Sequence, residues 1–97
     1  MDLTCGPMSE TMFYILFALR EERHGYGVMQ HVYMLTNGHM ELGAGTVYST
    51  LRRLERQKLI AATTEVDRRK NYVITESGMQ ALTAEARRIA ELNRLGK

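Results

Sequence analysis

The sequence of 97 residues contains one cysteine, one proline and no tryptophan. A single cysteine cannot form an intramolecular disulfide, which excludes a small secreted scaffold held by disulfides. The longest uninterrupted apolar run, residues 12–19, is too short to span a bilayer, and no charged-then-apolar leader opens the chain. We therefore expect a protein of the reducing cytoplasm that does not associate with membranes.

The composition is that of an ordinary globular protein, with 44% hydrophobic and 25% charged residues. The length predicts one domain, residues 1–97. A domain of this size buries only about 60–65% of the surface that its unfolded chain exposes. Its core is therefore small, and a partner subunit would stabilise it.

Charge is unevenly distributed along the chain. The net charge is only +2, but residues 43–74 carry seven basic and three acidic side chains, whereas residues 1–42 carry two basic and five acidic ones. Such a basic segment is suited to a polyanion, although its excess charge alone is a weak argument.

Hydrophobic periodicity and turn signals predict six elements. These are helices at residues 8–20, 26–35 and 46–58, strands at 59–66 and 71–75 around a charged tip at 67–70, and a helix at 76–95 capped by Thr75 and ended by Gly96. We expect Pro7 just before the first helix, a polar connection at residues 20–24, and inward-pointing Val28, Val32 and Leu35 on the second helix. The predicted fold is mainly α with a small β-hairpin, arranged as a winged helix-turn-helix with a C-terminal dimerisation helix. Residues 8–75 form the winged helix in this division, and residues 76–95 the dimerisation helix.

The helix at residues 46–58 has the composition of a DNA recognition helix. Val47, Leu51 and Leu54 share its inner side, because successive residues turn by about 100°. The outer and flanking positions hold small, hydroxyl and basic residues: Gly45, Thr46, Tyr48, Ser49, Arg52, Arg53 and Arg56. Small and hydroxyl residues allow close approach to base edges or phosphates, and arginine binds guanine or phosphate. A solvated basic face is an equally simple explanation of this helix taken alone.

The hairpin tip adds a second basic cluster, Arg68, Arg69 and Lys70. In a winged helix such a tip reaches the DNA backbone or minor groove beside the recognition helix. Three cations at a tip could also serve solubility or protect the edge of a sheet. The two clusters in this order favour DNA binding.

Several motifs along residues 7–82 together resemble the PadR family of bacterial transcriptional regulators. They are His24-Gly25-Tyr26-Gly27, Gly45-Thr46-Val47-Tyr48, Leu51-Arg52-Arg53-Leu54-Glu55 with Leu59-Ile60, and Arg68-Arg69-Lys70 with Tyr72, Thr75-Glu76 and Gly78. The resemblance implies a cytoplasmic repressor that binds a palindromic operator as a homodimer and is released by a small lipophilic or aromatic effector.

The same resemblance places Tyr48 on the DNA backbone and Tyr26 at a helix N-terminus that faces a phosphate. Two positions depart from the family pattern: Ala44 stands where many relatives have proline, and Asn71 where many have a second tyrosine. The chain ends soon after its last helix, so it resembles the short branch of the family that has no separate dimerisation domain.

We expect the dimer to form between the first and last helices. The last helix carries a narrow apolar stripe, and the first helix has a second apolar face that its own core does not need; the residues are Phe13, Tyr14, Phe17, Met79, Leu82, Ala86 and Ile89. The simpler alternative is that the last helix only covers its own domain. An apolar cavity at this interface could hold the effector.

The sequence offers little for other chemistry. Cys5 is a lone thiol, the three histidines lack the spacing of a metal site, and no nucleophile–base or carboxylate pair indicates an enzyme. We therefore expect no cofactor and no metal. Two alternative functions remain: a winged helix used only for protein–protein contact, and a ligand- or redox-sensing dimer with incidental DNA affinity.

Overall fold

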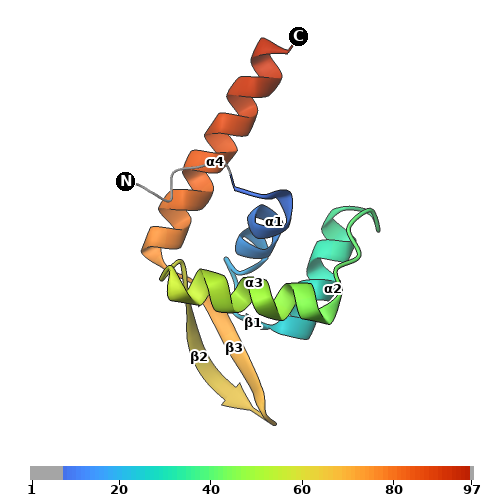
Figure 1. Cartoon of the computed structure of the whole chain (residues 1–97), viewed down its shortest axis with the longest axis vertical. Coiled ribbons are helices and arrows are strands. Elements are labelled where there is room, and N and C mark those ends of the chain that lie inside the picture. The colour runs from blue at the N-terminus through green and yellow to red at the C-terminus, as the bar shows by residue number, and fades with distance from the viewer. Residues whose placement is uncertain (1–7, 97) are drawn as a thin grey trace.

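The structure, a computed structural model, describes residues 8–96. In chain order the elements are α1 (Glu10–Ala18), β1 (Arg23–His24), α2 (Gly25–Leu35), α3 (Ala44–Arg56), β2 (Ile60–Val66), β3 (Arg69–Ile74) and α4 (Glu76–Leu95). The strands form one antiparallel sheet in the order β1-β3-β2. The predicted fold, mainly α with a small β-hairpin in a winged-helix arrangement, is confirmed. Figure 1 shows the hairpin of β2 and β3 projecting away from the free end of α4.

Side-chain caps explain where three of the helices begin. The Ser9 hydroxyl accepts a hydrogen bond from the Met12 amide at 3.1 Å, so α1 begins two residues later than predicted. Thr75 caps α4 as expected, accepting from the Gly78 amide at 3.0 Å. His24 caps α2, because its Nδ1 accepts from the Gly27 amide at 3.1 Å. Pro7, expected just before the first helix, lies outside the described residues.

The strand β1 was missed, since residues 20–24 were expected to be a polar connection. Its two residues pair with the middle of the wing, Arg23 with Tyr72 and His24 with Asn71. A strand of two residues has no hydrophobic alternation to detect, so only the tertiary pairing reveals it. This third strand joins the base of the wing to the helical body.

The core lies where α1, α2 and α3 meet the base of the sheet. Its buried residues are Ile15, Leu16, Ala18, Leu19, Val28, Val32, Val47, Leu51, Leu54, Ile60, Tyr72 and Leu82. The predicted inward residues of α3 are all fully buried. Leu35, expected to point inward from α2, is instead 42% exposed because it lies in the last turn, next to the cap at Thr36.

At Gly78, the first turn of α4 packs very closely against the segment that joins α3 to β2. A Cβ atom at this position would lie 2.1 Å from the Leu59 carbonyl oxygen and 2.6 Å from Ile74 Cγ1. The first turn of α4 therefore rests directly on the backbone between α3 and β2. Backbone atoms cannot move aside cheaply, so glycine is required here.

The Gly78→Ala variant is expected to be destabilised by about 3 kcal/mol, because the added methyl group overlaps backbone. The matched control is Gly45→Ala, since a Cβ at Gly45 meets no atom within 4 Å. That control should gain about 0.5–1 kcal/mol from its higher helix propensity. Urea unfolding followed by circular dichroism measures both. Equal stability of the two variants would contradict the close contact.

Candidate nucleic-acid interface

The burial of one edge of α3 fixes the direction in which its other side chains point. Val47, Leu51 and Leu54 are 0% exposed, and they hold the helix against the core. All seven predicted outer and flanking residues of this helix are exposed: Gly45, Thr46, Tyr48, Ser49, Arg52, Arg53 and Arg56. The structure therefore brings the predicted recognition residues together on one face.

The N-terminus of α3 is open. Its N-cap, Gly43, makes no side-chain hydrogen bond to the first turn, whereas α1, α2 and α4 each have a capping side chain. Cβ atoms built at Gly43 and Gly45 would have no neighbour within 4 Å. No contact within residues 8–96 therefore requires glycine at these two positions. The absence of side chains leaves the backbone amides of the first turn accessible to an external group.

The tyrosines at the junction of α2 and α3 have two different roles. The Tyr48 ring packs over Gly25, where a Cβ would lie 2.6 Å from a ring carbon. Gly25 is therefore glycine because Tyr48 occupies its side-chain space, an intramolecular role that the sequence did not indicate. Tyr48 nevertheless remains 42% exposed, and Tyr26 is 51% exposed beside it.

Tyr26 also connects this junction to the wing. Its ring stacks with the His24 ring at a centroid distance of 6.5 Å, and the Arg69 guanidinium carbon lies 6.0 Å from the ring centroid. Arg69 is the first residue of β3, so the wing places one of its cations next to the N-terminus of α2. The structure thus brings Tyr26 and the basic tip together, although they are more than 40 residues apart in the sequence.

The hairpin turn is tighter than predicted. Val66 pairs with Arg69, which leaves Asp67 and Arg68 as a turn of two residues, and Arg69 and Lys70 belong to β3. Asp67 and Arg68 have positive φ angles of 53° and 66°. Glycine is favoured at the second position of such a turn, and a residue with a Cβ costs roughly 1–2 kcal/mol there. Arg68 makes no hydrogen bond or ion pair with residues 8–96 that would offset this cost.

The basic side chains of α3 and the wing are not neutralised by the described part of the chain. The ion pairs among residues 8–96 join Arg23 to Glu21, Arg88 to Glu85 and Arg94 to Glu91, all outside this surface. Neutralising pairs are thus found elsewhere, while the exposed face of α3 and the wing keep a net positive charge. We call this surface, formed by the exposed residues among 45–58 and by residues 68–70, the basic face.

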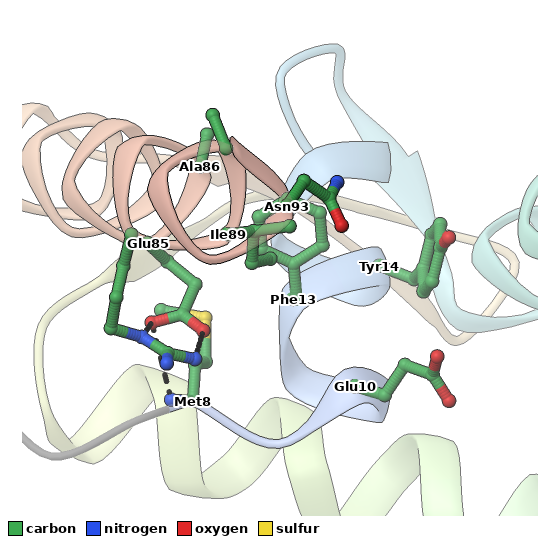
Figure 2. Close-up of a pocket in the computed structure, with 10 residues that line it drawn as sticks. Met8, Glu10, Phe13, Tyr14, Glu85, Ala86, Ile89 and Asn93 are labelled. Carbon is green, nitrogen blue, oxygen red and sulfur yellow. Dashed lines mark hydrogen bonds and ion pairs between the residues drawn. The ribbon is translucent and has the colours of Figure 1, made fainter. Parts of the chain in front are cut away.

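A second surface lies between α1 and α4, away from the basic face. Figure 2 shows this groove, where Phe13 and Tyr14 of α1 lie opposite Ala86, Ile89 and Asn93 of α4. Its volume is about 530 Å³. The Phe13 and Tyr14 rings contact each other edge to face at 5.7 Å, and Phe17 is covered by the Arg20 guanidinium at 3.9 Å.

Leu82 requires a correction. It was expected in the dimer interface, but it is 5% exposed and belongs to the core of its own chain. Met79 and Ile89, 40% and 37% exposed, remain at the surface. Two further apolar residues of α4, Leu92 and Leu95, are 54% and 67% exposed. They follow Ile89 at two intervals of three residues, so at about 100° per residue they turn progressively away from the predicted stripe.

Glu85 is a buried carboxylate between the start of α1 and α4, and no sequence motif indicated it. It is 6% exposed and accepts hydrogen bonds from Arg88 Nε at 3.2 Å, from Arg88 Nη2 at 2.5 Å and from the Met8 amide at 3.4 Å. The Arg88 hydrogen bonds are the main reason that the pKa of Glu85 lies below its ordinary value, although burial acts in the opposite direction. The dashed lines in Figure 2 mark these contacts, which tie the start of α1 to α4.

Because the folded-state pKa of Glu85 is lowered, its stabilising effect is present above the unfolded pKa of about 4.3 and is lost as the pH falls below it. Glu85→Gln is expected to lose about 1 kcal/mol near neutral pH and to depend less on pH between about 6 and 3 than the wild type. Urea unfolding at several pH values measures this. The control is Glu91→Gln, which breaks the corresponding exposed pair and should cost less than about 0.5 kcal/mol. If the free energy of unfolding of Glu85→Gln depends on pH just as that of the wild type does, the lowered pKa of Glu85 does not contribute to stability.

Within residues 8–96 there is no group of three His, Cys, Asp or Glu side chains placed to hold a metal ion. Over the same range, none of the helices combines the length and apolar character needed to cross a bilayer. Cys5, the lone thiol, lies outside the described residues.

Comparison with known proteins places residues 15–84 in a match to the PadR-like family of transcriptional regulators. The transcriptional regulator YqjI of Escherichia coli is 35% identical over 63 residues, covering 65% of this chain and 30% of YqjI. The chain therefore spans less than a third of the length of that relative.

Two solved structures show the same fold. A PadR family transcriptional regulator from Eggerthella lenta is 29% identical, with a TM-score of 0.71, covering 89% of this chain and 78% of its own. PadR of Bacillus subtilis, solved in complex with operator DNA, is 24% identical, with a TM-score of 0.68, covering 76% of this chain and 45% of its own.

Proposed function

Because the chain belongs to the PadR-like family of transcriptional regulators, we propose that its basic face binds double-stranded DNA sequence-specifically. The chain is then a cytoplasmic homodimeric repressor of a palindromic operator, released by a small lipophilic or aromatic effector. In this division residues 8–75 bind DNA and residues 76–95 join the subunits. The observation that carries the proposal is the basic face, whose cations on α3 and the wing make no ion pair with residues 8–96.

The open start of α3 supports its insertion into the major groove. Gly45, Thr46 and Ser49 are small and exposed, so the first turns can approach base edges closely. Arg52 follows on the same face and is placed for guanine or phosphate, and Arg53 and Arg56 are placed for phosphates.

The wing and the tyrosines complete the proposed interface. Arg68, at the turn, Arg69 and Lys70 contact the backbone or minor groove in this assignment. The cost of Arg68 in a left-handed conformation supports a function for its side chain outside the chain itself. Tyr26 and Tyr48 contribute the aromatic edge between α2 and α3, facing phosphates.

The direct test is selection of bound fragments from sheared genomic DNA of the source organism at about physiological salt, followed by sequencing. An enriched, two-fold symmetric site is expected. A dimer that enriches no sequence would contradict specific DNA binding and leave protein–protein contact as the use of this fold.

Two variants separate base contacts from backbone contacts. Arg52→Ala should weaken binding to the selected site by about ten- to hundredfold but change binding to random-sequence DNA much less. Arg69→Ala should weaken both and reduce the salt slope by about one unit. Fluorescence anisotropy over a salt series measures these effects.

The control is Arg87→Ala, which removes the same charge from the exposed surface of α4. It should bind like the wild type. If Arg87→Ala weakens binding as much as the other two variants, net charge rather than the basic face determines affinity.

We assign the homodimer to the α1–α4 groove and the adjoining apolar residues of α4. Phe13, Tyr14 and Phe17 are only partly buried by their own chain, and the distal half of α4 exposes Ala86 and Ile89. A two-fold axis through this surface brings the same residues together from both subunits. The groove is also the place proposed for the effector, which would favour one dimer geometry over another.

The dimer makes a specific prediction for Ile89→Asp. A charge in the middle of the interface should convert a dimer into a monomer at roughly micromolar concentration, because burying an unpaired carboxylate costs several kcal/mol. Light scattering with size exclusion measures the mass. Met34→Asp is the control, since Met34 is 74% exposed on α2, and it should remain a dimer. A monomeric wild type would contradict the assignment.

A further inference from the structure

We propose that Glu22, an acidic residue beside the basic face, is a positioning residue for DNA binding because it holds the wing at its bend. The inference rests on the proposed function. It concerns a group of hydrogen-bonded side chains at the middle of the wing: Glu22, from the connection before β1, with Thr63, Thr64 and Asn71.

The wing bends where the register between β2 and β3 changes. Ala62 pairs with Tyr72 and Glu65 pairs with Lys70, so three steps along β2 correspond to two along β3. Thr63 and Thr64 therefore both lie opposite Asn71, which is the arrangement of a β-bulge. A bulge interrupts the hydrogen-bonded ladder and bends the strand, so the outer part of the hairpin, with Arg68, Arg69 and Lys70, depends on this point for its direction.

Glu22 holds the bulge from outside the hairpin. Its Oε2 accepts hydrogen bonds from both threonine hydroxyls, from Thr63 and, at 3.3 Å, from Thr64. The Thr64 hydroxyl also accepts from Asn71 Nδ2 at 3.2 Å. Asn71 pairs in turn with His24 of β1. The carboxylate thus joins the connection between α1 and β1 to both strands of the wing.

An isolated two-stranded hairpin is marginally stable, and β1 supports this one only at Asn71 and Tyr72. Contacts at the bulge, together with the Tyr26 ring beside Arg69, therefore limit how far the tip moves relative to α3. By holding the bulge, Glu22 keeps the cations of the tip at a fixed distance from the recognition helix, so that both can contact one stretch of DNA.

The negative charge of Glu22 and its hydrogen bonds to the wing predict opposite changes in DNA affinity when the residue is substituted. A carboxylate near phosphate-binding cations repels DNA, so loss of its charge alone strengthens binding. Loss of the hydrogen bonds releases the wing and weakens binding. The sign of the change in affinity therefore distinguishes a positioning residue from a nearby negative charge.

The test compares Glu22→Ala with Glu22→Gln in the full chain. The probe is a duplex carrying the sequence recovered by the genomic selection, and a random-sequence duplex of the same length is the reference. Glu22→Ala is expected to bind the selected duplex about three- to tenfold more weakly, the effect of losing one or two hydrogen bonds. Glu22→Gln loses the charge but keeps an oxygen acceptor, so it should bind at least as tightly as the wild type.

Glu21→Ala is the charge-matched control. Glu21 is the neighbouring residue, its side chain is 80% exposed and it pairs with Arg23 rather than with the wing. It should bind at least as tightly as the wild type. Thr63→Val should weaken binding, and combining it with Glu22→Ala should add little, because both variants remove the same contact.

Hydrogen exchange provides a readout independent of DNA. Amides of residues 64–70 should exchange faster in Glu22→Ala than in Glu22→Gln, while the global stability of both stays close to wild type. In an Arg69→Ala background the effect of Glu22→Ala on DNA affinity should be smaller, because the wing has then already lost one of the cations that Glu22 positions.

The inference is overturned if Glu22→Ala tightens binding as Glu22→Gln does, or if exchange in the wing is unchanged. Failure of the proposed function is distinguishable, because it is seen in the wild type: a chain that binds neither duplex contradicts DNA binding itself, and with it the role of Glu22.

Discussion

Burial of one edge of α3 is the constraint on which the rest of the structure depends. Val47, Leu51 and Leu54 leave this helix only one orientation, because turning them toward water would expose three fully buried side chains at about 2 kcal/mol each. The three arginines of the helix, Arg52, Arg53 and Arg56, are thereby directed outward. The fold thus determines which positions of α3 form the basic face, and substitutions at these outer positions leave the core undisturbed.

Some residues of this surface lower the stability of the fold, and no contact within residues 8–96 offsets that loss. Gly45 lies inside a helix although nothing occupies the space of a side chain, and Arg68 has a positive φ angle where glycine is favoured. Each choice destabilises the isolated chain by roughly 1 kcal/mol. Departures from local preference of this kind concentrate at functional sites, because the selective requirement comes from a partner outside the chain.

The sequence predicted the element order and the outward face of α3 because both follow from local periodicity. The prediction that Leu35 points inward was wrong for a local reason too. Leu35 is the last residue of α2, so its side chain does not reach the core. The remaining misses are tertiary. Strand β1, the contact of Gly25 with Tyr48, the hydrogen bonds of Glu22 to the wing and the hydrogen bond from Met8 to Glu85 join residues distant in sequence, and a single sequence contains no signal for such pairings. Leu82 was placed on the right stripe, but periodicity cannot say whether a stripe packs on its own chain or on another.

The basic face and the α1–α4 groove are joined by a rigid connection. One residue, Thr75, separates the end of β3 from α4, and its hydroxyl donates to the Lys58 carbonyl oxygen at 2.8 Å while capping the helix. Three residues later Gly78 rests on the Leu59 carbonyl. A change in the direction of α4 therefore cannot be absorbed by a flexible linker. It must be transmitted to the end of α3 and to the base of the wing, because the contacts between them are backbone contacts that leave no room for sliding. In the dimer proposed above, a ligand that reoriented α4 in the groove would in this way alter the spacing of the two α3 helices without touching either of them.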